Sequence, residues 1–317
     1  MIVFLTTRGH EFGVDTLVER AFPDLPECRA MAYEDLFLAA SVRSATFVFC
    51  DIDRLAPWET RMAVERYQTL MQAGMRCLND PARVMCRREL LTKLHRRKFN
   101  PFDVYAAEMR PRPKRFPVFI RSEAEHQLVF PDLLPDQEAL ERKLRELRRS
   151  GVALRDLLVV EFAATPIAPG AWHRIGTFRI GDAYSVDSFA VQDHWRVSNG
   201  TKGFATEAMF QAEHEAVRSN ALAEAVRPAF EMAEIEYGRA DHAPHDGRQV
   251  VFEINTNPTI GPIAGQRLPI RTETLRISRA RMAAHLQAID TAEAAIVKLP
   301  PLSRRAKVVE APTILRP

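Results

Sequence analysis

The stretch YGRADHAPHDGRQVVFEINTNPTIGP, residues 237–262, contains two strand-like segments with a carboxylate in each. Asp246-Gly247 lies between them and is a strong turn signal, which predicts a β-hairpin. Folding the chain about Gly247 brings Asp241 nearly opposite Glu253. The predicted hairpin therefore gathers acidic side chains from two strands at one place.

Glu253, Asn255 and Asn257 alternate along the second strand, so their side chains point to one face. Asp241 joins them in the predicted register. Two carboxylates and a carboxamide oxygen repel one another unless a cation lies between them, and an all-oxygen set favours Mg²⁺ over zinc. The alternative is a hairpin with solvated acids on its outer face. The apolar neighbours of Glu253 favour the metal site, and Mg²⁺ usually bridges substrate phosphates, which points to a nucleotide.

The overall composition is that of a soluble globular protein. The 317 residues are enough for about two or three compact units, with 46% apolar and 27% charged residues. A net charge of +3 is small for this length and gives no reason to expect a nucleic-acid or membrane partner. The apolar start is too short for a signal peptide, and no run approaches the roughly 18 apolar residues of a bilayer span. Four scattered cysteines suggest a reducing compartment, so we expect a cytoplasmic protein.

Strand-like and helix-like segments alternate along the chain and predict an α/β (α+β) fold. Residues 1–78 contain two apolar strands with helical segments, which indicates a small parallel sheet. The next helix is expected to be capped by Asn79 or Asp80. Beyond it we expect strands at 115–123 and 156–162, a hairpin at Gly181-Asp182, helices at about 205–219 and 221–233, and a mostly helical segment at 272–298. Residues 299–317 are proline-rich and basic and are expected to form a loosely held tail.

At DHAPHDGRQVVFEINTNP the chain resembles the ATP-grasp superfamily, which includes D-alanine–D-alanine ligase, glutathione synthetase and the enzymes that add glutamate to protein ends. The C-terminal motif of that family is an acid, a hairpin and a strand that reads E-(I/V)-N-x-x-P. Asp241, Glu253, Asn255 and Pro258 match it. In the family the first three positions hold two Mg²⁺ ions between the phosphates of ATP. The resemblance therefore implies ATP and two Mg²⁺ ions, for which Mn²⁺ could substitute.

The resemblance extends more weakly over residues 79–262 and implies a division into domains. Residues 1–78 would form a Rossmann-like pre-ATP-grasp domain, residues 79–155 the first ATP-grasp subdomain, and residues 156–298 the second subdomain with the metal hairpin, followed by the tail. FPVFIR resembles a strand whose basic residue contacts phosphate, LLVVEF the hinge strand that meets adenine, and GTFRIGD a strand whose arginine reaches the phosphates. Members of the family are often dimers, so a homodimer is compatible with the resemblance.

Two arginines are expected to act on the phosphates as catalytic groups. Arg121 ends an apolar strand, where a charge is costly unless it meets an anion, and its fork suits phosphate. A surface ion pair with Glu123 or Glu125 is the alternative. Arg179 is expected to share a polar face with Thr177 and to point into the cleft. Arg174 could assist the phosphate contact or belong to the rim.

Four further residues are candidates for binding the nucleotide. Glu161 and Phe162 end the hinge strand, where backbone groups could pair with adenine and Glu161 could accept from its amino group; a solvated strand end is the alternative. Asn199 and Lys202 lie in a glycine-bearing loop before a helix, which is either an anion site or a plain capped turn.

Two other features concern the phosphates less directly. The family often has a phosphate-binding lysine in the helix that follows residue 79, and Arg87 or Arg88 falls nearest that place, although a solvated helix face is the favoured interpretation. No metal-ligand spacing is present among His126, His173, His194, His242 and His245. His242 is a candidate only because it adjoins Asp241.

The sequence departs from the family at the glycine-rich flap that folds over the phosphates. The corresponding residues, 122–136, contain no glycine and have four acids. Backbone amides approach phosphates most easily where side chains are absent. The chain therefore either closes over ATP differently, with help from Ser122 and His126, or has lost efficient catalysis.

Three functions remain open from the sequence. The first is an ATP-dependent ligase that joins a small carboxylate to an amine through an acyl phosphate, or a kinase on the same fold. The second is a nucleotide-binding or partner-binding protein without turnover. The third is an α/β protein whose acidic hairpin is coincidental.

Overall fold

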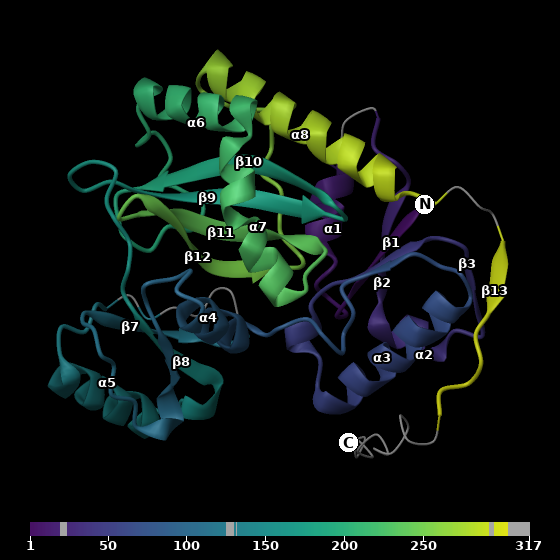
Figure 1. The fold of residues 1–317 in the computed structure, drawn as a ribbon, viewed down its shortest axis with the longest axis horizontal. Helices are drawn as coiled ribbons and strands as arrows, with labels where there is room; N and C mark the ends of the chain where they lie inside the picture. Colours follow the sequence, from purple (N-terminus) through teal and green to yellow (C-terminus); the bar gives the residue numbers. More distant parts are fainter. Residues whose placement is uncertain (20–23, 125–129, 131, 292–294, 304–317) are drawn as a thin grey trace, which may run out of the picture.

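The computed structural model describes residues 1–19, 24–124, 130, 132–291 and 295–303. Within them the chain forms two four-stranded sheets, one three-stranded sheet and one two-stranded ribbon. Figure 1 shows the N-terminal sheet beside two further α/β layers, with the long antiparallel sheet above the three-stranded one. The predicted α/β (α+β) fold class is confirmed.

The N-terminal sheet has the strand order β2-β1-β4-β5, and all its strands are parallel. Strands β1 and β4 are completely buried, which explains why their sequences, IVFLT and TFVF, are unbroken apolar runs. The predicted parallel sheet is therefore present. Its elements are β1 (Ile2–Thr6), β2 (Cys28–Ala32), β4 (Thr46–Phe49), β5 (Cys77–Leu78), α1 (Phe12–Glu19), α2 (Tyr33–Leu38), the 3₁₀ turn Ile52–Arg54 and α3 (Pro57–Gln72).

The three-stranded sheet is antiparallel, with β8 between β6 and β7. Helix α5 covers it with a row of leucines, Leu140, Leu144 and Leu147, at helical spacing. The elements of this part are α4 (Arg87–Arg96), β6 (Val104–Ala106), β7 (Val118–Ser122), α5 (Gln137–Arg149), β8 (Leu157–Glu161) and the 3₁₀ turns Ala107–Met109 and Leu154–Asp156.

The second four-stranded sheet is antiparallel, in the order β10-β9-β11-β12. Both predicted hairpins are present, with turns at Gly181-Asp182 and Asp246-Gly247. Helices α6, α7 and α8 lie on one side of the sheet (Figure 1). The elements are β9 (Trp172–Ile180), β10 (Ala183–Gln192), α6 (Glu207–Ser219), α7 (Ala221–Ala233), β11 (Tyr237–His245), β12 (Arg248–Asn255) and α8 (Pro269–Ile289).

Asn79 does not cap a helix, and that prediction is wrong. Its backbone has a positive φ of 63°, and its side chain is completely buried. The amide Nδ2 donates to the carbonyls of Phe49 and Tyr237 at 3.0 and 2.9 Å, while Oδ1 accepts from the N–H groups of Glu236 and Tyr237. Asn79 therefore joins the N-terminal sheet to the start of β11, and helix α4 begins only at Arg87.

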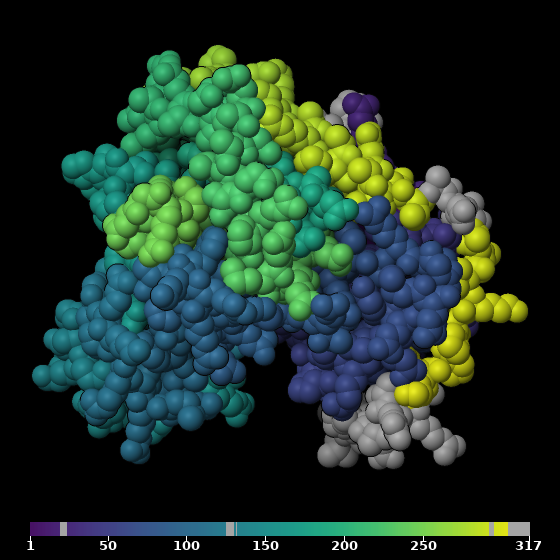
Figure 2. Space-filling model, viewed as in Figure 1, coloured from purple at the N-terminus to yellow at the C-terminus, as the bar shows by residue number. Residues whose placement is uncertain are grey.

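The C-terminal segment is not a continuation of helix α8, and the described part of the tail is not loosely held. Strand β13 (Ile296–Lys298) pairs with β3 (Ser41–Arg43) as a two-stranded ribbon. Leu299 and Leu302 are buried in the core of the N-terminal unit. Figure 2 shows this segment, in yellow, along the outer side of that unit. Residues 304–317 lie outside the described residues.

The sequence predicts reduced cysteines and contains no apolar run long enough to span a bilayer. The cysteines at positions 28, 50, 77 and 86 are free thiols. Among the described helices, none has the length and apolar character that a membrane crossing requires.

Candidate nucleotide and metal site

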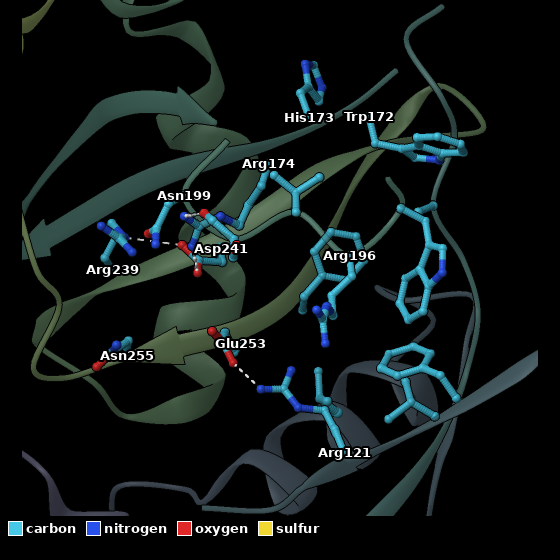
Figure 3. Close-up of a pocket in the computed structure, with 18 of the residues that line it drawn as sticks. Arg121, Trp172, His173, Arg174, Arg196, Asn199, Arg239, Asp241, Glu253 and Asn255 are labelled. Carbon is cyan, nitrogen blue, oxygen red and sulfur yellow. Dashed lines mark hydrogen bonds and ion pairs between the residues drawn. The ribbon is translucent and has the colours of Figure 1, made fainter. Parts of the chain in front are cut away.

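A cavity of about 940 Å³ lies where the three α/β parts of the chain meet. Its lining comes from the segments after β1 and β4, from the three-stranded sheet, from β9, β11 and β12, and from the loop after β10. Figure 3 shows Arg121 on one side, facing Glu253, with Arg174 and Arg239 around Asp241. Of the residues predicted from the sequence, the cavity brings together Arg121, Glu161, Phe162, Arg174, Asn199, Asp241, Glu253 and Asn255.

The hairpin of β11 and β12 positions the two acids as predicted. Asp241 is the direct partner of Glu253, and a β-bulge follows at once, so that His242 pairs with Val251. The bulge leaves Phe252 without a counterpart on β11 and re-aims the side chains around it. Both acids consequently line the same cavity, and Asp241 is buried.

Glu253 is bound by two arginines. Its Oε2 accepts from Arg87 at 2.8 Å and from Arg121 at 2.7 Å. Arg87 also donates to the carbonyls of Ser122 and Glu123, and it is only 8% exposed. The favoured interpretation of Arg87 as part of a solvated helix face is therefore wrong. Burial lowers the pKa of Arg121, and the carboxylate of Glu253 opposes this effect.

Asp241 is also bound by two arginines. Arg174 donates to Oδ2, and Nε of Arg239 donates to Oδ1 at 3.2 Å. Arg239 also donates to the carbonyl of Thr259 at 2.9 Å. Burial by itself would lower the pKa of Arg239, but Asp241 and the nearby Asp187 raise it above its ordinary value. Arg239 also lies against Gly176, where a Cβ would approach its Cδ to 3.0 Å.

Asn255 connects the acids to the N-terminal unit. Its Oδ1 accepts from the backbone N–H of Asn257 at 2.8 Å. The side chain of Asn257 donates to the carbonyl of His10 and to Oδ2 of Asp51, at 2.8 and 3.1 Å. Burial raises the pKa of Asp51. The strand that carries the candidate metal ligands is thus tied to the loops after β1 and β4.

The donor chemistry fits a magnesium ion, with one restriction. Asp241, Glu253 and Asn255 present oxygen atoms only, which is the set that Mg²⁺ takes. Within the described part of the chain, no group of three acidic, histidine or cysteine side chains lies close enough together to hold a metal by itself. Each carboxylate is also paired with two guanidinium groups. The residues therefore fit an ion that arrives together with phosphate oxygens.

An aromatic slot occupies the side of the cavity next to strand β8. The ring of Trp195 lies 5.0 Å from that of Phe119 and 5.4 Å from that of Phe162, between centroids. Phe102 stacks on Phe252 at 6.1 Å in the same lining. Flat apolar walls of this kind suit a flat ring system such as a nucleobase.

Comparisons with protein-family models and with curated sequences give no match. Among solved structures, the chain is similar to VanG D-Ala:D-Ser ligase from Enterococcus faecalis, with a TM-score of 0.51 and 11% identity over 91% of this chain and 98% of that chain. The chain has the ATP-grasp fold. D-alanine–D-alanine ligase from Bacillus anthracis complexed with ATP gives a TM-score of 0.49 at 12% identity, over 91% and 94% of the two chains. A RimK domain ATP-grasp protein from Sphaerobacter thermophilus gives 0.44 at 16%, over 90% and 100%.

Glu161 has a different task in this ATP-grasp fold from the one predicted. Its Oε1 accepts from the hydroxyl of Tyr105 and from the N–H groups of Lys114 and Arg115, and its Oε2 from the N–H of Asp103. The side chain is 2% exposed. Because both oxygens are engaged, the prediction that Glu161 accepts from an adenine amino group is not supported. Its carboxylate fastens the segments around Asp103–Tyr105 and Lys114–Arg115 to strand β8.

Two of the predicted binding residues lie outside the cavity lining. Arg179 donates to the carbonyls of Gly181 and Ile235 and stacks over Tyr184, on the helix-covered side of the sheet. The prediction that it points into the cleft is wrong. Lys202 is exposed in the loop before α6, and Thr206 caps that helix by accepting from Met209. The plain capped turn is therefore the better interpretation for Lys202, whereas Asn199, in the same loop, lines the cavity.

The other residues that the sequence singled out for the site are wholly or partly buried or lie outside the residues that the structure describes. His242 is completely buried between the hydroxyl of Thr177 and the carboxamide of Gln249, both at 2.8 Å. Burial lowers its pKa to about 4. His173, in the cavity lining, also has a pKa lowered to about 4 by burial. Ser122 is buried at the end of β7, and His126 lies outside the described residues.

Sequence reasoning missed the second arginine on each acid. Arg239 lies two residues before Asp241 on the same strand, so the alternation of strand side chains could have identified it. Arg87 falls near the place of the family's phosphate-binding lysine, but its partner Glu253 is 166 residues away along the chain. No local sequence pattern indicates that contact. Trp195, in the slot, gave no signal in the sequence.

Proposed function

We propose that the protein is an ATP- and Mg²⁺-dependent ligase that joins a carboxylate to an amine through an acyl phosphate. One observation carries the proposal: two facing acids, each paired with arginines, lie in a cavity between an aromatic slot and the N-terminal loops. A nucleotide would place its base in the slot and its phosphates along the arginines. The N-terminal end of the cavity would then receive the substrate that accepts the phosphoryl group.

The arginines that face the cavity would act on the phosphates. Arg121 and Arg174 would bind phosphate oxygens, and Arg239 would keep Asp241 in position. Mg²⁺, held by Asp241, Glu253 and Asn255, would neutralise charge on the phosphates. Fixed positive groups of this kind favour the transition state because they are in place before charge moves.

The proposed reaction has two displacements. An oxygen of the substrate carboxylate attacks the terminal phosphorus, the bond to the bridging oxygen breaks, and ADP leaves. The amine then attacks the carbonyl carbon of the acyl phosphate, inorganic phosphate leaves, and the amine loses a proton to water. No protein nucleophile is required, and the chain's part is to bind and orient the reactants.

The N-terminal unit would supply the acceptor end. His10, Phe12, Asp51 and Arg54 line the cavity there, and they come from the segments that follow β1 and β4, including the start of α1 and the 3₁₀ turn Ile52–Arg54. Ligands commonly bind at the carboxyl ends of parallel strands, and these loops occupy that position. A small-molecule kinase would use the same arrangement with a hydroxyl in place of the carboxylate.

A nucleotide-binding protein without turnover is the second candidate. The observation that favours it is the lack of glycine in residues 122–136, where glycine would let backbone amides approach the phosphates.

The test is to offer ATP and Mg²⁺ with pairs of amino acids and small carboxylates, and to measure the release of ADP and phosphate. Release that requires both a carboxylate and an amine supports the ligase. Release with a single acceptor and no amine supports a kinase. Thermal stabilisation by ATP without release across the panel supports the second candidate.

A matched pair of variants identifies the site. Glu253→Gln should abolish any release, whereas Asp246→Asn, an acid that is 81% exposed in the turn of the same hairpin, should not. A protein that ATP and Mg²⁺ neither stabilise nor react with would contradict both candidates.

A further inference from the structure

The two acids of the hairpin have a common arrangement of partners. Each is bound by a more deeply buried arginine, with 5% or 12% of its side chain exposed, and by a less buried one, with 10% or 22% exposed. For Glu253 these are Arg87 and Arg121, and for Asp241 they are Arg239 and Arg174. We call Arg87 and Arg239 the backing arginines, and Arg121 and Arg174 the front arginines.

The backing arginines are held too firmly to leave their acids. Arg87 does not line the cavity, and its guanidinium also donates to the carbonyls of Ser122 and Glu123. Arg239 lines the cavity but donates to the carbonyl of Thr259 and packs against Gly176. Arg87 is 8% exposed. Each carboxylate therefore keeps one positive partner whatever else binds.

Arg121 has fewer fixed contacts than Arg87, whereas Arg174 and Arg239 each donate to one backbone carbonyl besides Asp241. The Nε of Arg121 and the Nε of Arg174 are both buried without a hydrogen-bond partner, and both side chains line the cavity. The Nε of Arg87 is in the same state, but the terminal nitrogens of Arg87 are engaged and its side chain is not in the lining. Arg174 also donates to the carbonyl of Ser198, in the loop after β10. A guanidinium with an unused buried donor stands to gain a hydrogen bond when an anion enters.

The cluster of four arginines and two acids has an excess of two positive charges. The other charged side chains of the lining do not remove it, since Arg54 and Arg196 are matched in number by Asp51 and Glu161. Asp187, behind Arg239, is itself paired with Arg279. An empty site of this charge attracts a polyanion and repels a lone divalent cation.

We infer that this cavity binds the polyphosphate of a nucleotide without a divalent metal, because the arginines supply the positive charge. A triphosphate moves the front arginines from the acids to its oxygens, and the backing arginines keep the acids neutralised. Magnesium then joins the bound phosphates as a second step, with one ion sufficient to balance the remaining charge. The inference rests on the proposed function for the identity of the ligand, and it departs from the expectation that two ions hold the phosphates.

The experiment measures the dissociation constants of ATP and of inorganic tripolyphosphate for the full chain, at low ionic strength, with EDTA and with excess Mg²⁺. We expect both ligands to bind in EDTA, with constants within about tenfold of those in Mg²⁺, a ratio at the low end of ordinary coupling between ligands. Added salt should weaken the binding in EDTA more strongly, because the complex without metal relies entirely on attraction between the arginines and the polyphosphate.

The outcomes distinguish the inference from the proposed function. Binding in Mg²⁺ with a loss of more than about tenfold in EDTA overturns the inference and leaves the proposed function in place. Absence of binding under both conditions overturns both. Because the wild-type protein suffices for this comparison, the result does not depend on whether a variant folds.

A matched pair of variants tests the backing role. Arg87→Met should weaken the binding of tripolyphosphate in EDTA by roughly tenfold and increase the dependence on Mg²⁺, because Glu253 loses its fixed partner. Arg88→Met removes the same charge from the next residue of α4, where the side chain is 49% exposed and pairs with Glu123. It should leave the ratio between Mg²⁺ and EDTA unchanged. Equal ratios for the two variants would overturn the backing role, and with it the inference.

Discussion

Arg174 and Arg179 leave the same strand, β9, on opposite sides of the sheet. Arg174 enters the cavity and binds Asp241, whereas Arg179 lies under the helices and binds the carbonyls of Gly181 and Ile235. The two residues are five positions apart, an odd spacing that puts side chains of a strand on opposite faces. They are therefore a natural pair for separating a role in ligand binding from a role in stability.

Arg174→Met should weaken the binding of ATP and Mg²⁺ by roughly tenfold to a hundredfold, the usual range for a lost hydrogen bond to a charged group. Arg179→Met should leave that affinity within about twofold and lower the free energy of unfolding by about 1–2 kcal/mol, because two carbonyls lose their donor. Calorimetric titration and urea denaturation measure the two effects. The reverse pattern, with Arg179 controlling affinity, would show that the face of β9 has been misassigned.

Asn79 should be worth more to stability than its position in a loop suggests. Its side chain makes four hydrogen bonds between the N-terminal sheet and the start of β11, so Asn79→Ala is expected to cost about 3 kcal/mol of unfolding free energy. Asn79→Gly removes the same bonds but tolerates the positive φ of 63°. It should therefore be less destabilising than alanine by about 1 kcal/mol. Identical urea midpoints for the wild type and both variants would rule out this connection.

Gly13 in helix α1 should not tolerate alanine, although alanine usually stabilises a helix by about 1 kcal/mol. A Cβ at this position would lie 2.0 Å from Oδ1 of Asn257. Gly13→Ala is expected to destabilise the protein by roughly 2 kcal/mol, in the usual range for overpacking. The double variant with Asn257→Ala should show a smaller effect of the alanine, which a double-mutant cycle measures. A stabilising Gly13→Ala would show that α1 does not approach the β12–α8 loop so closely.

His242 should make the protein less stable in mild acid. Its pKa in the folded protein is lowered to about 4 by burial, from an ordinary value of 6.5. The unfolded chain therefore takes up a proton first, so stability is complete above pH 6.5 and falls as the pH decreases towards 4. The loss amounts to about 3 kcal/mol from this residue.

The comparison that isolates His242 uses the slope of stability against pH. His242→Asn should have a lower free energy of unfolding at neutral pH but a flatter decline between pH 6.5 and 4. His194→Asn, at an exposed position, should keep the wild-type slope. Parallel curves for the wild type and His242→Asn would contradict the assignment.

The sequence predicts those parts of the site that depend on local chemistry. The turn residues Asp246 and Gly247 determine the hairpin, and the alternation along β12 then places Glu253 and Asp241 together. The parallel sheet is equally clear, because β1 and β4 are apolar throughout. These predictions need only neighbours in the chain.

The predictions that failed depend on packing between distant segments. Strand β9 is largely buried, with the helices on one side and the rest of the molecule on the other, so apolar alternation does not show which side Arg179 takes. Asn79 resembles a helix cap until its partners Phe49 and Tyr237 are known. Arg87 becomes a site residue only through Glu253, 166 residues further along. The domain boundaries at residues 78, 155 and 298 stay predictions.

The ribbon of β3 and β13 has a consequence for how the chain can be divided. The N-terminal unit contains both ends of the described chain: Met1 binds Asp290, Arg66 donates to the carbonyl of Pro300, and Leu302 is buried in its core. A fragment that stops at residue 78 would leave this hydrophobic surface uncovered and would be expected to aggregate. During synthesis the unit that starts first would be completed last. Expression of the isolated halves would then be a poor route to either one, whereas a circular permutant that joins the termini would keep the unit intact.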